Sequence, residues 1–217
     1  MGICQGFAIM VSQSFGAKRL DEMHTYIYAG AVWTAITAFV VSILVVVFCA
    51  DILHILQVND EIFKDAYAYL VVIFAGIPFT LLYNYLSAIL RAIGDSKTPF
   101  FFLAFSAFLN IGLDFFCILV LKWGCAGAAI ATIFAQAVSG ILCLLLIAFK
   151  VNVLHIPKSS RYVDKQHSLK LLAMGVPMGL QFSITAIGSM VMQSANNALG
   201  TIYVSGFTAG MRIKSLM

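Results

Sequence analysis

Charged side chains are scarce in this chain: only 10% of its 217 residues are charged, whereas 62% are hydrophobic, and the mean hydropathy is +0.99. Short strands of alternating polarity, which a membrane-spanning β-barrel requires, are also lacking. The apolar residues instead form continuous runs of about 20, long enough to cross a bilayer as helices that satisfy their own backbone hydrogen bonds. The sequence therefore predicts an all-α integral membrane protein.

Motifs for catalysis or metal binding are missing as well. The sequence contains no nucleophile elbow, phosphate-binding loop or CxxC pair, and its five cysteines are scattered, mostly within apolar runs. These patterns predict neither an enzyme nor a disulfide framework nor a cofactor. The net charge of +4 does not indicate nucleic acid as a partner, because the basic residues cluster in short loops, where they act as an orientation signal.

Five complete membrane spans are predicted, at residues 25–50, 67–90, 100–121, 124–149 and 169–192. Both ends of the chain are unusual. The apolar stretch Gly2 to Phe15 is short for a crossing, and the last apolar run stops at Met217 before a span is complete. We therefore expect partial helices at both ends and an internal segment of a longer protein.

The basic residues predict an orientation. Nine of the thirteen fall in or beside connections on one side of the predicted spans: Lys18, Arg19, Arg91, Lys97, Lys150, Lys158, Arg161, Lys165 and Lys170. Lys64 and Lys122 fall on the other side, so the positive-inside rule places the first group in the cytoplasm. The longest connection, residues 151–168, is then cytoplasmic and predicts a boundary between residues 1–150 and 169–217.

Pro78 and Pro177 lie inside predicted spans. A proline in a helix frees one carbonyl group and permits a bend. Bends of this kind occur where transporter helices line a cavity, but a simple packing kink explains them equally well.

Asp114 is the only one of the nine acidic residues that falls in the middle of a predicted span. An ionised carboxylate in hydrocarbon costs several kcal/mol, so such a group is usually paired, protonated or exposed to a water-filled cavity. Because an amide would hold helices together at lower cost, the carboxylate favours a functional role.

Other polar residues share the helix faces near Asp114. Asn110 lies four residues before it, Thr132 and Gln136 are four apart on the next span, and Asn84 follows Pro78 on the preceding one. Their oxygens are hard ligands, which suit a proton or Na⁺ and do not suit zinc or copper. The alternative is that these side chains only tie helices together, for about 0.6 kcal/mol each.

Several motifs resemble those of multidrug and toxic compound extrusion (MATE) transporters. The segment SQSFGAK at residues 12–18 resembles the family's SQxxGA signature, LRAIGDSKTP at 90–99 resembles its LRAxGDxKTP connection, and LNIGLD at 109–114 resembles its LNxxLD helix. GCAGAAIAT at 124–132, and Gly175-Val176-Pro177 with Gln181, fit as well. The similarity extends over essentially the whole chain.

This resemblance implies a twelve-helix antiporter made of two six-helix bundles, which moves organic compounds outward in exchange for Na⁺ or H⁺. Residues 1–150 then correspond to the end of helix 2 through helix 6, residues 151–168 to the linker, and residues 169–217 to helix 7 and the start of helix 8. It also implies a cation site at Asn84, Asn110, Asp114 and Thr132. Gln136, Gln181 and Tyr83 are candidates for the substrate cavity.

The leading hypothesis is thus a multi-pass exporter of the cytoplasmic membrane with a small, cationic or amphipathic organic substrate. One alternative is a flippase for lipid-linked sugars from the same superfamily, which would need cationic residues in the cavity; only Arg212 and Lys214 qualify. Another is a truncated, non-transporting membrane remnant. The sequence indicates no oligomeric state.

Overall fold

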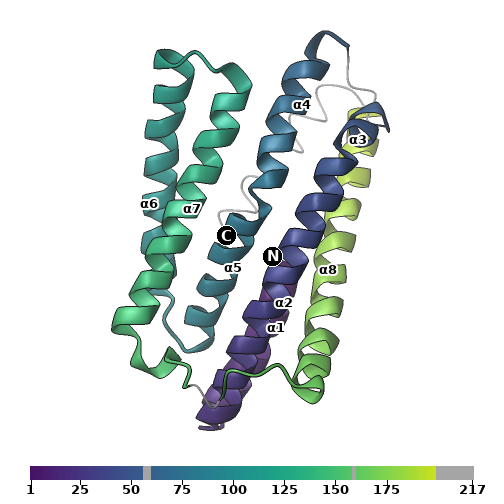
Figure 1. Cartoon of the computed structure of the whole chain (residues 1–217). Coiled ribbons are helices and arrows are strands. Elements are labelled where there is room, and N and C mark those ends of the chain that lie inside the picture. Colours follow the sequence, from purple (N-terminus) through teal and green to yellow (C-terminus); the bar gives the residue numbers. More distant parts are fainter. Residues whose placement is uncertain (56–59, 158–159, 199–217) are drawn as a thin grey trace.

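The computed structural model describes residues 1–55, 60–157 and 160–198, and every regular element in these ranges is helical (Figure 1). The elements are α1 (Gly2–Gly16), α2 (Leu20–Val47), α3 (Cys49–Ile55), α4 (Asp60–Ala75), α5 (Ile77–Ala92), α6 (Lys97–Phe115), the π-helix η1 (Phe116–Val120), α7 (Gly124–Lys150), the 3₁₀-helix η2 (Asn152–Leu154) and α8 (Lys165–Ala198). The all-α fold is confirmed.

Long apolar helices match the predicted spans. Within the described residues, four are long and apolar enough to cross a membrane, namely α2, α6 with η1, α7 and α8, and the bent pair α4–α5 makes a fifth. Helix α1 is 15 residues long, or about 22 Å, which is shorter than the hydrocarbon core of about 30 Å. The incomplete run predicted at the carboxyl end, with Arg212 and Lys214, lies outside the described residues.

The connections between helices lie at the two ends of the bundle in the way that the charge pattern predicts. In Figure 1 the α1–α2 turn, the α5–α6 turn and the α7–α8 connection all lie at the lower end of the bundle, whereas the α6–α7 turn lies at the upper end. The basic residues assigned to one side therefore gather at one end, apart from Lys158, which the structure does not describe. We call this lower end the basic end.

The two prolines inside predicted spans lie in different surroundings. The span predicted at residues 67–90 is two helices that meet at Gly76 with a 43° bend, and Pro78 lies in the first turn of α5, where a missing N–H is harmless. Pro177, by contrast, lies inside the continuous helix α8. That helix begins at Lys165, within the segment predicted as linker.

Large buried side chains join α1, α2 and α5 near the basic end. Phe7, Met23 and Leu90 are completely inaccessible to solvent, and the hydroxyl of the buried Tyr85 donates a 2.7 Å hydrogen bond to the carbonyl oxygen of Ile27. The outward faces are also apolar: Phe149, for example, is 80% exposed. Such a surface is stable only against lipid, so the chain is a multi-pass membrane protein.

Glycines allow α1 and α8 to touch along their backbones. A Cβ atom added at Gly6 would lie 2.6 Å from the Cα atom of Gly175, and one added at Gly2 would lie 2.9 Å from the Cα atom of Gly179. Small residues permit this close approach of helices in membranes. The packing fixes α8 against the first part of the chain.

The segment at residues 90–99 stops one helix and starts the next. Gly94 has a φ of +92°, which closes α5 through bonds from the Gly94 and Asp95 N–H groups to the carbonyls of Arg91 and Leu90. The Asp95 carboxylate then accepts a 3.0 Å bond from the Thr98 N–H at the start of α6. Hydrogen bonds from Thr98 hold the pKa of Asp95 below its usual range.

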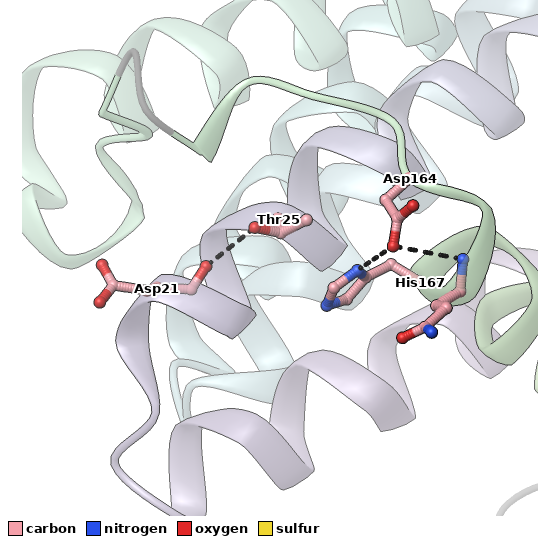
Figure 2. Close-up of polar contacts among 5 residues, drawn as sticks. Asp21, Thr25, Asp164 and His167 are labelled. Atoms are coloured by element: carbon pink, nitrogen blue, oxygen red, sulfur yellow. Dashed lines mark hydrogen bonds and ion pairs between the residues drawn. The ribbon is translucent and has the colours of Figure 1, made fainter.

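The connection between α7 and α8 is docked on the rest of the bundle. The His24 ring on α2 is 2.8 Å from the carbonyl oxygen of Val153, and the Tyr26 ring meets His167 edge-on. In Figure 2 the Asp164 carboxylate faces both the His167 ring and a backbone N–H, each at 3.3 Å, beside the first turns of α2. These contacts fix where α8 begins.

Candidate functional site

The bend between α4 and α5 packs directly on α7. A side chain at Gly76 would collide with Ile133 of α7, so only glycine lets the bend approach this closely. On α5, four residues after Gly76, the Thr80 hydroxyl donates a hydrogen bond to Oε1 of Gln136, which is also on α7. The start of α5 is therefore held against α7 by one backbone contact and one polar contact.

Asn84 lies one helical turn beyond Thr80. Its side-chain amide donates a 2.7 Å hydrogen bond to the Thr80 carbonyl oxygen. Both residues line a cavity of about 290 Å³ between α1, α2 and α5, together with Cys4, Thr34 and Thr37. Sequence reasoning missed Thr80, although its spacing of four from Asn84 on an apolar helix was the available signal.

Asn110 and Thr132 meet across the α6–α7 contact. The Asn110 amide nitrogen lies 3.3 Å from the Thr132 hydroxyl oxygen, and the Thr132 hydroxyl donates a 2.9 Å bond to the carbonyl oxygen of Ala128. The structure thus brings together two of the four predicted cation-site residues.

Asp114 follows Asn110 by one turn and is half-buried. Its Oδ1 atom is inaccessible to solvent and has no hydrogen-bond partner within the described part of the chain. A carboxylate oxygen in this state is costly unless a proton or a cation accompanies it. The π-helix η1 begins two residues later, and π-turns within helices often occur at functional sites.

Helix α7 joins these groups into one polar row. Thr132 faces Asn110 of α6, and Gln136, one turn further along α7, faces Thr80 of α5. Asn84 is linked to the row only through the Thr80 backbone: within residues 1–55, 60–157 and 160–198 no hydrogen bond connects its side chain to Asn110, Asp114 or Thr132. Of the predicted cation-site residues, Asn110 and Thr132 are therefore in contact and Asp114 lies one turn from Asn110, whereas Asn84 lies apart, at the cavity between α1, α2 and α5.

The other two substrate-cavity candidates lie away from this row. The Tyr83 hydroxyl donates a 3.0 Å hydrogen bond to the Pro99 carbonyl oxygen and so ties α5 to the start of α6. Gln181 is exposed on α8. Gln136, Tyr83 and Gln181 are all absent from the linings of the 290 Å³ cavity and of a larger groove described below, so their role in substrate binding stays a prediction.

The fold and the polar row define a class of protein: a polytopic helical membrane protein with an acid inside its spans, one of whose oxygens is buried without a hydrogen-bond partner among the described residues. The sequence profile of the MatE family matches residues 1–116. The chain belongs to this family.

Comparisons with individual proteins agree. The probable multidrug resistance protein YpnP of Bacillus subtilis (strain 168) is 33% identical over 220 residues, which cover 100% of this chain and 48% of that relative. The multidrug export protein MepA of Staphylococcus saprophyticus is 23% identical, with coverages of 96% and 46%. This chain spans about half the length of the curated relatives it matches.

Solved structures show the same fold. A MOP superfamily transporter from Pyrococcus furiosus superposes with a TM-score of 0.89 at 22% identity, over 99% of this chain and 48% of that one. An inward-facing multidrug resistance MATE family transporter superposes with a TM-score of 0.83, also at 22% identity, over 99% and 49% of the two chains. The chain is thus a multi-pass protein of the cell membrane with the MATE fold.

Proposed function

We propose that this chain supplies one half of a cation-coupled antiporter that exports small organic compounds across the cytoplasmic membrane. The proposal rests on the buried Oδ1 atom of Asp114, which has no hydrogen-bond partner in the part of the chain that the structure describes and lies beside the Asn110–Thr132 pair. The names of YpnP and MepA, which refer to multidrug resistance and multidrug export, support the choice of organic substrates.

Asp114 couples the two movements because its environment favours different charge states at different times. Burial in an apolar span favours the neutral acid, whereas a bound cation favours the carboxylate. A ligand that binds one conformation better shifts the protein toward that conformation. Release of H⁺ or Na⁺ from Asp114 therefore biases the transporter between its two orientations.

The substrate proposed is small and cationic or amphipathic, with Gln136, Tyr83 and Gln181 as candidate contacts. A flippase for lipid-linked sugars is not proposed. Its cationic candidates, Arg212 and Lys214, lie outside the described residues, and YpnP and MepA carry drug-related names.

We also propose the division of the chain predicted from its sequence. Residues 1–150 belong to the first bundle, residues 151–168 form the linker, and residues 169–217 begin the second bundle. The non-helical stretch between η2 and α8 supports a linker in this region, although α8 itself begins at Lys165 and packs on α1.

The function is tested by Asp114→Asn in the full-length protein that contains this segment. Asparagine keeps the shape of the side chain but cannot bind and release a charge-compensating proton, so drug efflux driven by an imposed Na⁺ or H⁺ gradient in vesicles should be abolished. Asp51→Asn, which removes an exposed acid of the short helix α3, is the control and should transport normally. Unchanged efflux by Asp114→Asn would refute the coupling role.

The coupling ion is tested by the neighbours of the acid. A proton needs only the carboxylate, whereas Na⁺ needs several oxygens at once. If Na⁺ binds here, Asn110→Leu and Thr132→Val should each raise the Na⁺ concentration for half-maximal transport and have less effect on proton-driven transport. Equal loss under both gradients would leave these two residues with a structural or proton-relay role.

The orientation is tested by a cysteine at Val163, an exposed position in the α7–α8 connection, in a variant lacking the five native cysteines. The positive-inside rule predicts labelling only by reagents that reach the cytoplasm. Ready labelling from outside intact cells would reverse the topology.

A further inference from the structure

A groove of about 720 Å³ lies between α2, α5 and α7 near the basic end and is bordered there by the α7–α8 connection. Most of its lining is aliphatic or aromatic, as at Ile27, Leu82, Leu86 and Ile147. This volume falls within the range of roughly 300–1,000 Å³ that is usual for ligand-binding pockets in proteins. The polar row at Asp114 does not contribute to it.

The basic part of the lining lies at one end. His155 and Arg161 of the α7–α8 connection lie there, and the Arg161 Nε–H donates a 3.2 Å bond to the carbonyl oxygen of Ile156, which holds the guanidinium at the mouth. Arg161 forms no ion pair with an acidic side chain in the described part of the chain. Its two terminal amino groups therefore remain for an anionic partner.

The length of the groove matches one leaflet of a bilayer. Along α2 the lining extends from Ile27 to Phe39, twelve residues apart, which corresponds to about 18 Å of helix. Half of the hydrocarbon core measures about 15 Å. The groove thus runs from the basic end to about the middle of the membrane. A transmembrane helix from another part of a longer protein would need a groove about twice as long.

We propose that this groove binds an anionic glycerophospholipid from the leaflet at the basic end. An acyl chain lies along α2 and α5, and the phosphate accepts paired hydrogen bonds from the Arg161 guanidinium, the geometry that arginine favours with phosphate groups. Basic pockets between membrane helices on the cytoplasmic side recognise lipid head groups in the same way. Lys150 and Lys165, at the same end, add to the positive field.

The first test measures lipid retained by the purified chain. The chain is reconstituted in nanodiscs of phosphatidylcholine mixed with phosphatidylglycerol and released into mild detergent, and the bound lipids are counted by native mass spectrometry. Arg161→Gln should lower retention of phosphatidylglycerol about fivefold, the contribution of one basic residue near a membrane surface. It should lower retention of phosphatidylcholine less, because the choline cation of that lipid already neutralises its phosphate. Lys170→Gln, an exposed lysine at the same end outside the groove lining, is the matched control and should retain lipid normally.

The second test fills the groove. Ala35 lines it from an exposed position on α2, so Ala35→Trp should displace the acyl chain without disturbing the core, whereas Ala107→Trp on the exposed face of α6 should not. Helix content and size-exclusion profile confirm folding of each variant. Equal phosphatidylglycerol retention by the wild type and Arg161→Gln, or by the wild type and Ala35→Trp, would overturn the proposal. The proposal would also be overturned if the isolated chain retained phosphatidylglycerol and the longer protein did not, because another helix would then occupy the groove.

Discussion

The contact of α1, α2 and α5 differs sharply from the contact of α6 and α7. In the first region large side chains such as Phe7, Met23 and Leu90 are fully buried, and the buried Tyr85 hydroxyl has its hydrogen-bond partner. Of the residues of α6, only Pro99 is buried, and the neighbouring polar groups include an unpartnered carboxylate oxygen. The comparison indicates that the first region stabilises the bundle. The second region contains a buried carboxylate that is stable only when a cation or a proton neutralises its charge.

The largest effect on stability is expected in the first region. Leu90→Ala leaves a cavity at a fully buried position and should cost about 2–5 kcal/mol, seen as a lower midpoint of thermal unfolding in detergent. Leu103→Ala on α6, where the side chain is 56% exposed, should change the midpoint little. Equal losses at the two sites would remove the distinction between the two regions.

The next effect concerns the bend that joins the two regions. Gly76→Val places a side chain against Ile133 and should cost about 1–3 kcal/mol through overpacking. Ile133→Ala in the same chain should restore part of the loss. Gly112→Val on α6, where an added Cβ meets nothing within 4 Å, is the control; a loss there as large as at Gly76 would show that valine itself, and not the contact, is responsible.

A smaller effect is expected from the polar contact between α5 and α7. Thr80→Val removes the hydrogen bond to Gln136 and should cost about 0.6 kcal/mol, the usual value for such bonds between membrane helices. In a double-mutant cycle Gln136→Leu should add little once Thr80 has been replaced. Thr185→Val, which breaks only a bond within α8, serves as the control. Strictly additive losses would show that the Thr80–Gln136 pair does not couple.

The smallest effect is a pH dependence at the turn between α5 and α6. Because the pKa of Asp95 is lowered in the folded protein, its contribution is present above the usual aspartate pKa of about 3.9 and is lost as the pH falls through the lower folded value. Unfolding measured across this acidic range should therefore show a small decline that is absent in Asp95→Asn. A decline of the same size in that variant would assign the effect to other acids.

Much of this arrangement could be predicted from the sequence, because membrane spans depend on long apolar runs and their orientation on loop charges. The spacing of four residues also predicted that Asn110 shares a helix face with Asp114, and Thr132 with Gln136. The packing of the bend at Gly76 was harder to predict. Pro78 marks the bend in the sequence. The contact of Gly76 with Ile133, by contrast, joins two helices through residues that are 57 positions apart.

The docking of the α7–α8 connection was not predictable either. His24 and Val153 are 129 residues apart, and no local pattern indicates that an imidazole will meet that carbonyl. The same applies to Arg161, which the sequence assigned only to an orientation signal and which the fold places at the mouth of a groove. Such pairings depend on tertiary packing and not on helix periodicity.

The π-helix after Asp114 has a consequence for comparing this chain with its relatives. A π-turn pairs each residue with the fifth along instead of the fourth, so it contains one more residue than the α-helical turn it replaces. Here the N–H of Leu121, and not that of Val120, donates a hydrogen bond to the carbonyl oxygen of Phe116. A relative whose helix continues without the π-turn should be one residue shorter here, so its alignment with this chain should have a one-residue gap within 116–120. An alignment that places the gap at another position would pair the wrong residues between that position and the π-turn.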